Sequence, residues 1–131
     1  MELPIEVGIS PTLGIRGLIA ARDIRKGEVI ERCPVVFIDN RHAHLVEQTV
    51  FDDFWFEWNK QVSCIALGYG GLYNHSYKPN AKFHYDYRNR RMVFSAFKRI
   101  RKGEELFINY NGEPNDRSKV TTHFVDGAVH G

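Results

Sequence analysis

The sequence predicts one mostly β domain with few short helices, and three observations lead to this expectation. The chain has 131 residues, of which 43% are hydrophobic and 13% aromatic, so it can bury a core without disulfide or metal staples. Short apolar or alternating segments recur between turns, a pattern typical of strands. The string Ile-Arg-Lys-Gly-Glu, a glycine turn that leads into a short strand, occurs twice, at 24–28 and 100–104.

The expected elements follow in chain order. Residues 17–21 and 29–38 are apolar enough to form strands. A hairpin is expected over 83–97, because aromatic residues alternate on its first arm and an arginine-rich turn precedes the second. Residues 41–50 carry the one helical pattern, with Asn40 as its candidate N-cap.

The domain is expected to span 1–112 and to be followed by a tail at 113–131, which is polar and rich in Gly, Asn and Thr. The amino terminus has no basic and apolar leader, and the longest purely aliphatic or aromatic run is 35–38. We therefore expect no signal peptide and no membrane span. Cys33 and Cys64 lie far apart, which favours an intracellular, reducing compartment, either cytoplasmic or close to the genome.

Charge is unevenly distributed along a chain whose formal net charge is only +2. Residues 88–102 include seven basic residues and no acidic one. Residues 39–58 include five acidic residues and the single Arg41, interleaved with aromatic residues. Both runs could be solvated faces. The acidic and aromatic run also suits a cationic peptide, and the basic run leaves open a nucleic-acid-binding β-domain.

Several common catalytic motifs are missing from the sequence. It contains no G-x-S-x-G, H-E-x-x-H or G-x-x-x-x-G-K-[ST] pattern. The glycines at 68–71 lack the spacing of a nucleotide loop and indicate a closely packed turn. His42 and His44 would not share one helix face, so no metal site is expected there or elsewhere.

Two segments carry more specific information. Residues 74–80 read Asn-His-Ser-Tyr-Lys-Pro-Asn, and residues 103–110 read Gly-Glu-Glu-Leu-Phe-Ile-Asn-Tyr. They resemble the N-H-S-x-x-P-N and G-E-E-L-x-x-x-Y motifs of SET-domain protein-lysine methyltransferases, in the family's order. Residues 13–20 and 66–70 are also similar to that family, and the resemblance extends over 7–112. It is strongest with the small single-domain viral and bacterial members, which lack pre-SET and cysteine-rich post-SET modules.

The resemblance implies a SET, or β-clip, fold of small curved sheets in which the carboxyl-terminal strand forms a pseudoknot. It also implies methyl transfer from S-adenosylmethionine to a protein lysine, with Tyr110 as the catalytic residue. The residues expected to bind the cofactor are Ile15, Arg16, Gly17, Asn74, His75 and Tyr110. The residues expected to line the substrate-lysine channel are Tyr69, Tyr73 and Ile108, and the aliphatic Ile108 favours a higher methylation state.

The sequence departs from the family pattern at two places. Ile15 stands where the family usually has glycine, and Gly14 lies one position earlier. Without a post-SET module, covering the cofactor would fall to the tail, through Phe124, or to a second subunit, so a homodimer is one open arrangement. The expected partner is a basic, lysine-containing protein such as a histone, with neither nucleic acid nor membrane required. A SET-fold binding module without catalysis is the alternative function.

Overall fold

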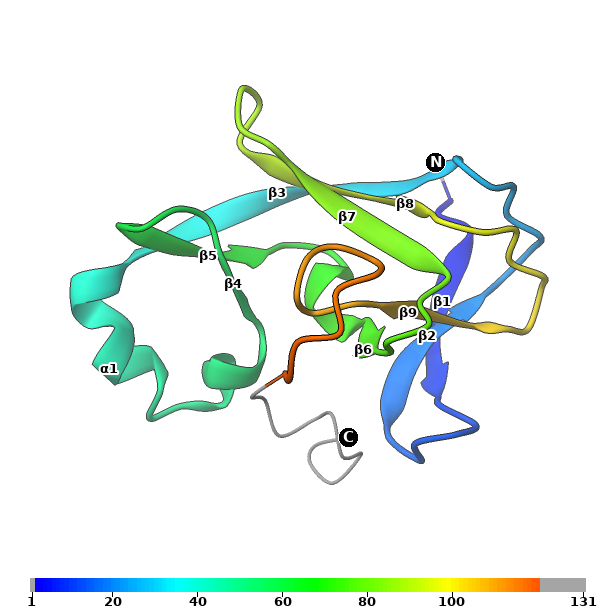
Figure 1. Ribbon diagram of the computed structural model, residues 1–131, viewed down its shortest axis with the longest axis horizontal. Helices are drawn as coiled ribbons and strands as arrows, with labels where there is room; N and C mark the ends of the chain where they lie inside the picture. The colour runs from blue at the N-terminus through cyan, green and yellow to red at the C-terminus, as the bar shows by residue number, and fades with distance from the viewer. Residues whose placement is uncertain (1, 121–131) are drawn as a thin grey trace.

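Two β-sheets organise the chain in the computed structural model, which describes residues 2–120 (Figure 1). The first sheet has the order β1-β2-β9-β6. Its strands are β1 (Ile5–Ile9), β2 (Arg16–Ala20), β9 (Glu105–Ile108) and β6 (Asn74–His75). β9 pairs antiparallel with β2 and parallel with β6. Because β9 lies between them, segments from the beginning, middle and end of the domain meet in this sheet.

The second sheet is antiparallel and five-stranded, with the order β4-β5-β3-β8-β7. Its strands are β4 (Trp55–Glu57), β5 (Val62–Ala66), β3 (Val29–Asp39), β8 (Arg91–Ala96) and β7 (Ala81–Asp86). The long strand β3 pairs with β8 along its first half and with β5 along its second half. It therefore connects the two ends of the sheet.

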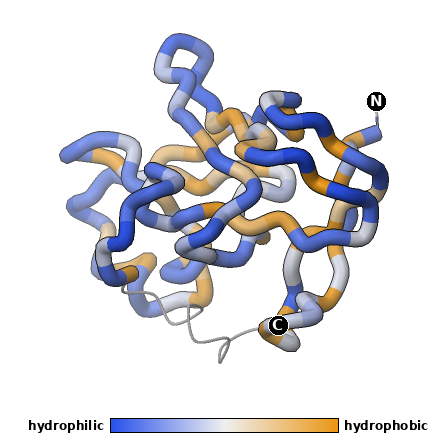
Figure 2. Tube along the Cα trace, turned by 45° about the vertical axis from the view of Figure 1, so that its right-hand side comes forward, coloured by the Kyte–Doolittle hydropathy of each residue, from blue (hydrophilic) through white to orange (hydrophobic). Residues whose placement is uncertain are grey.

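The mostly β fold predicted from the sequence is confirmed, and so are the strands at β2 and β3. The predicted hairpin is β7 and β8, with strand ends within about two residues of the expected bounds. Arg90 at its tip has a φ of 53°, as a tight connection requires. Figure 2 shows hydrophobic segments running through the middle of the molecule and a hydrophilic tip on this hairpin.

The helix predicted over 41–50 is wrong in extent. The structure has the short 3₁₀ helices η1 (Asn40–His42) and η2 (Val50–Asp53), with α1 (Ala43–Val46) between them. Asp39, not Asn40, caps η1, because its carboxylate accepts the Arg41 N–H at 2.9 Å. Asn40 instead accepts the Ser63 hydroxyl at 2.8 Å. None of the three helices contains a buried residue, and a helix without a buried face gains too little from packing to extend.

The two Ile-Arg-Lys-Gly-Glu copies pair with each other. Ile24 and Ile100 are fully buried and exchange backbone hydrogen bonds at 2.7 and 2.9 Å. Gly27 and Gly103 both adopt positive φ, at 85° and 89°. The N–H of Gly27 donates to the last carbonyl of β8 at 2.9 Å, and the N–H of Gly103 donates to the last carbonyl of β2 at 2.8 Å. The repeat is thus a reciprocal clasp that holds the two sheets together.

The hydrophobic core combines residues from both sheets. Cys33 and Cys64 lie in it as free, buried thiols. The glycine segment at 68–71 is a packed turn, as expected, and continues into the 3₁₀ helix η3 (Gly70–Leu72). Within residues 2–120, no helix is long and apolar enough to cross a membrane.

Candidate active site

Asn74 is the centre of a buried polar network where β6, β9 and β2 meet. Its amide nitrogen donates to the Arg16 carbonyl at 3.0 Å and to the Glu105 carboxyl at 2.8 Å. The Ser10 hydroxyl donates to the other oxygen of Glu105. A Cβ on Gly17 would lie 2.5 Å from the Glu105 carboxyl and 2.7 Å from the Asn74 amide, so only glycine fits there. Both N–H groups of Asn74 are thus committed, and its carboxamide oxygen is the group that can accept from a ligand.

The loop between β1 and β2 shapes the approach to this network. Ser10 closes it by donating its N–H to the Ile15 carbonyl at 2.7 Å and accepting the Gly14 N–H at 3.0 Å. Gly14 takes positive φ, at 72°, and the Ile15 side chain is buried. The displaced glycine in the sequence therefore makes the turn, and the buried Ile15 side chain follows it immediately before β2.

Tyr110 lies just beyond β9 and is held at both its backbone and its side chain. Its N–H donates to Nδ1 of His75 at 3.0 Å, and its hydroxyl donates to the Tyr73 carbonyl at 2.7 Å. Because the hydroxyl hydrogen is used in this way, toward any substrate the oxygen can act as an acceptor. Burial raises the pKa of Tyr110, with the nearby Asp53 and Glu105 acting in the same direction. The side chain is therefore a neutral phenol.

His75 contacts Tyr110 through its imidazole ring. Burial lowers its pKa, which favours the neutral ring whose Nδ1 accepts the Tyr110 N–H. The hydrogen is then on Nε2, which is buried and has no hydrogen-bond partner among the described residues. A buried donor without a partner is costly, so Nε2 is a second polar group that a bound ligand could satisfy.

Tyr73 is itself fixed from behind. Its ring stacks on Phe94 with centroids 4.4 Å apart, and its hydroxyl donates to Glu31 at 3.1 Å. The other Glu31 oxygen accepts the Tyr69 N–H at 3.4 Å. Burial raises the pKa of Glu31. This support determines where the Tyr73 carbonyl lies, and so where the Tyr110 hydroxyl lies.

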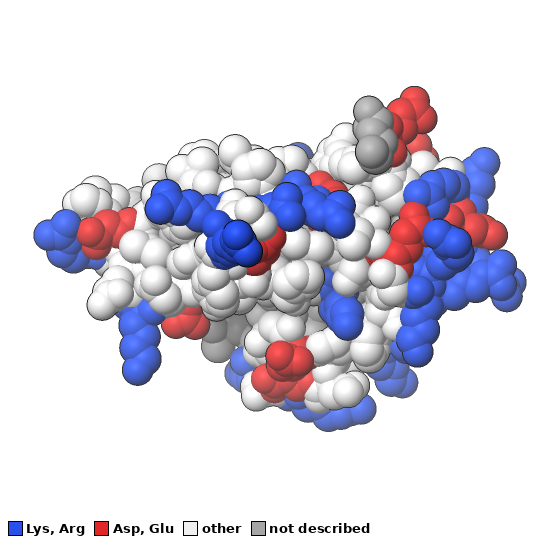
Figure 3. All heavy atoms as spheres, turned by 90° about the horizontal axis from the view of Figure 1, so that it is seen from above, with Lys and Arg blue, Asp and Glu red and all other residues white. Residues whose placement is uncertain are grey.

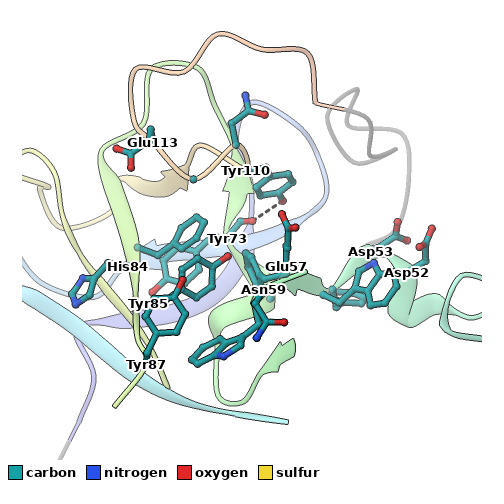
Figure 4. Close-up of a pocket in the computed structure, with 18 residues that line it drawn as sticks. Asp52, Asp53, Glu57, Asn59, Tyr73, His84, Tyr85, Tyr87, Tyr110 and Glu113 are labelled. Carbon is teal, nitrogen blue, oxygen red and sulfur yellow. Dashed lines mark hydrogen bonds between the residues drawn. The ribbon is translucent and has the colours of Figure 1, made fainter. Parts of the chain in front are cut away.

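A pocket of about 560 Å³ opens beside Tyr110 and Tyr73 (Figure 4). Aromatic rings from β4 and β7 form much of its wall, and the segment at 110–113 borders it. Its acidic lining residues are Asp52, Asp53, Glu57 and Glu113. Within the described chain, no lysine or arginine lines it. A pocket of this composition suits a positively charged, partly aliphatic chain such as lysine.

Comparison with known proteins agrees with this geometry. A family model described as SET domain matches residues 15–111. The chain belongs to the SET domain family. A Schizosaccharomyces pombe protein named histone-lysine N-methyltransferase, H3 lysine-37 specific, is 30% identical over 108 residues, covering 82% of this chain and 73% of that protein. A crystal structure of a Plasmodium falciparum candidate histone methyltransferase has 35% identity and a TM-score of 0.66, covering 83% of this chain and 98% of that one.

The structure gathers the predicted cofactor residues of this SET domain into two adjoining groups. Arg16 and Gly17 contact the Asn74 network, and Ile15 precedes them with its side chain buried. His75 and Tyr110 form the second group, and β6 joins the groups because it contains both Asn74 and His75. Their binding of a cofactor stays a prediction.

The predicted channel residues are separated by the structure. Of the three, Tyr73 lines the pocket, next to the expected catalytic residue Tyr110. Ile108 is fully buried in the core, and Tyr69 is partly buried against that core, so neither lines this pocket. Their place in the channel stays a prediction. Of the acidic, aromatic run at 39–58, the part from 52 to 58 lines the pocket.

Sequence reasoning missed three polar residues that position the site. Ser10 and Glu105 hold the Asn74 network, and Glu31 supports Tyr73. All three are buried. A glutamate inside an apolar strand, as at β3 and β9, was the available signal, since carboxyl groups are rarely buried without a specific partner.

The start of the tail folds back toward the site. The Asn109 amide donates to the Asp116 carbonyl at 2.6 Å, and the Asn111 amide donates to the Ser118 carbonyl at 2.7 Å. The Tyr77 hydroxyl also donates to Ser118, at 3.0 Å. Phe124, the tail residue expected to cover the cofactor, lies outside the described residues. Within residues 2–120, no cluster of three His, Cys, Asp or Glu side chains could hold a metal ion.

Proposed function

We propose that this chain transfers a methyl group from S-adenosylmethionine to the side-chain amine of a lysine in a basic protein. One observation carries the proposal: Tyr110 is tied through His75 to the Asn74 side of the site, while its hydroxyl lies at the acidic, aromatic pocket. Tyr110 thus joins a region suited to a cofactor, through its backbone N–H, with a region suited to lysine, through its hydroxyl. Membership of the SET family and the names of the two relatives support this assignment.

The residues present fit S-adenosylmethionine. Asn74 retains an acceptor oxygen suited to an ammonium group, and His75 retains a buried donor at Nε2. Gly17, which has no side chain, lets the Asn74 amide and the Glu105 carboxyl pack directly against the backbone of β2. When bound, the cofactor supplies an electrophilic methyl group on a sulfonium. Arg16, Gly17, Asn74 and His75 would hold it, and no metal is required.

The chain must also deliver lysine as a neutral amine. A free lysine with a pKa of ~10.4 is neutral in only about one molecule in 2,500 at pH 7, a deficit of about 4.6 kcal/mol. Asp52 and Asp53 would attract the ammonium form to the pocket. Desolvation in the pocket beside Tyr73 and Tyr110 would then favour loss of the proton. The Tyr110 oxygen can accept an N–H of the amine and so orient its lone pair.

The substrate that suits the pocket is a lysine-rich segment of a histone or another basic protein associated with DNA. The Schizosaccharomyces pombe relative is named for a lysine of histone H3. We also propose an intracellular, reducing location, which the free thiols of Cys33 and Cys64 support. A homodimer remains an open proposal.

The test is transfer of labelled methyl from S-adenosylmethionine to purified histones and ribosomal proteins, followed by mass spectrometry of the modified residue. We expect label on lysine in at least one basic protein and little with Tyr110→Phe. Calorimetry with the cofactor and its demethylated product runs in parallel. A folded protein that binds the cofactor but modifies no lysine would favour the binding-module alternative. A protein that binds neither compound would refute the assignment.

A further inference from the structure

The clasp formed by the two Ile-Arg-Lys-Gly-Glu copies gathers positive charge at one end of the molecule. Figure 3 shows Lys and Arg concentrated at its right-hand end, where Figure 1 places the chain that precedes β3 and the chain that precedes β9. The exposed basic residues of 21–28 and 97–104 are Arg22, Arg25, Lys26, Lys98, Arg99, Arg101 and Lys102. We call these seven residues the basic pole. It joins part of the basic run at 88–102 to residues more than 70 positions earlier.

The charge of the basic pole is only partly neutralised by its acidic neighbours. Arg22 lies 2.6 Å from Glu28, and Arg25 lies 3.8 Å from the same carboxylate. Arg99 lies 3.5 Å from Asp23. The four other members form no ion pair within 4.0 Å among the described residues, and they are Lys26, Lys98, Arg101 and Lys102. About four exposed cations are therefore available to a partner.

The turns themselves do not need these basic side chains. Glu28 accepts the backbone N–H of Arg25 at 3.1 Å, and Glu104 accepts that of Arg101 at 2.8 Å. With the buried isoleucines and the positive-φ glycines, these contacts account for both turns. The Lys-Gly step requires its glycine, but Lys26 could be any residue that tolerates a turn. The need to form these two turns therefore does not explain why so many basic residues lie here.

The basic pole and the pocket carry charges of opposite sign. Four acidic residues and no lysine or arginine line the pocket within the described chain, whereas the pole carries an excess of cations. No exposed aromatic residue lies in 21–28 or 97–104, so the pole offers no stacking surface for unpaired bases. Charge without stacking fits the phosphate backbone of a duplex.

We infer that the basic pole is a docking surface for the phosphate backbone of duplex DNA. Lysine-rich proteins bind DNA through the same phosphates, so this contact would bring the pocket to a basic substrate that is already on DNA. The benefit to methyl transfer rests on the proposed function. Binding of DNA by the pole does not, because it requires neither cofactor nor turnover.

The test measures binding of the whole chain to a fluorescent duplex DNA by anisotropy at several salt concentrations. Four phosphate contacts predict a slope of log K against log salt of about −3.6, or about 150-fold weaker binding at 200 mM than at 50 mM salt. The double variant Lys26→Gln and Lys102→Gln should reduce the slope by about 1.8. The matched control, Arg88→Gln and Arg90→Asn, removes two charges from the β7–β8 tip, with asparagine tolerating the positive φ, and should keep the slope.

Activity measurements separate the two proposals. The Lys26 and Lys102 variant should methylate a free peptide like the wild type but lose rate on a protein substrate bound to DNA. Absence of DNA binding at 50 mM salt, or equal loss in the pole and control variants, would overturn the docking surface whatever the enzyme activity. Equal affinity for single-stranded DNA or polyglutamate would overturn the assignment to duplex DNA.

Discussion

Replacing Tyr110 with phenylalanine removes one oxygen from the site and keeps the ring. That oxygen donates to the Tyr73 carbonyl at 2.7 Å, so its loss leaves the carbonyl without this donor. The expected cost to the free energy of unfolding is about 1 to 3 kcal/mol. The Asn74 network does not include the hydroxyl, so affinity for S-adenosylmethionine should change little.

The effect of Tyr110→Phe on turnover should be larger than its effect on folding. An acceptor aimed at the reacting amine is worth about 2.7 to 4 kcal/mol in the transition state, so kcat should fall by about 10² to 10³. The assay combines thermal denaturation, calorimetry with the cofactor, and kcat on an unmodified lysine peptide that the wild type methylates. Measuring all three on one variant separates a catalytic oxygen from a structural one.

A matched variant separates the loss of the Tyr110 oxygen from the general loss of a buried hydroxyl. Tyr73→Phe also removes a buried phenol oxygen, the one that donates to Glu31, but it keeps the carbonyl that holds Tyr110. We expect a similar loss of stability and a much smaller loss of kcat. Full kcat in folded Tyr110→Phe, or equal loss of kcat in both variants, would refute the role of the Tyr110 oxygen in orienting the amine.

Three further predictions concern titration, support and charge. Because burial lowers the pKa of His75, its stabilising bond to the Tyr110 N–H should be intact above pH ~6.5 and be lost as pH falls through the lowered pKa. His75→Asn should remove this pH dependence in denaturation curves, and an unchanged curve would contradict it. Glu31→Gln should lose about half as much stability as Glu31→Leu, because its one carbonyl oxygen can still accept from one of the two donors. Glu31→Leu should lose about 2 to 6 kcal/mol by leaving both donors unpaired, as urea denaturation would measure. Charge reversal at Asp52 and Asp53 should raise KM for a basic peptide more at low than at high salt, and the same KM at low salt would return these acids to a solvated face.

The candidate site was predictable in its residue types but not in its connections. The motif around Asn74 located a polar centre, yet nothing local indicated that both of its N–H groups are used by Arg16 and Glu105. Glu105 belongs to the second motif, and its partner Ser10 lies 95 residues earlier. Which of these distant residues form hydrogen bonds depends on how the strands pair and pack. The periodicity of the sequence does not predict that pairing.

The helix and the charged runs show the same limit. The pattern at 41–50 contained helix-forming residues. However, the Asn40 side chain accepts a hydrogen bond from Ser63 of the neighbouring strand, and the helix buries no apolar face. The basic run at 88–102 was one segment in sequence, whereas folding divides it between the β7–β8 tip and the basic pole. Local propensity was overridden wherever a tertiary partner offered a stronger interaction.

The sequence by itself determined strands β2 and β3, the β7–β8 hairpin, the glycine turns and the order of the two motifs, because these depend on backbone preference and on which side chains avoid water. The tertiary structure decided which of these elements lie next to each other and which of their side chains meet. It placed β9 between β2 and β6, joined Asn74 to Glu105, and set the Tyr110 hydroxyl against the Tyr73 carbonyl. Each of these contacts joins residues at least 31 positions apart, so its geometry exists only once the sheets have formed and excluded water from the network.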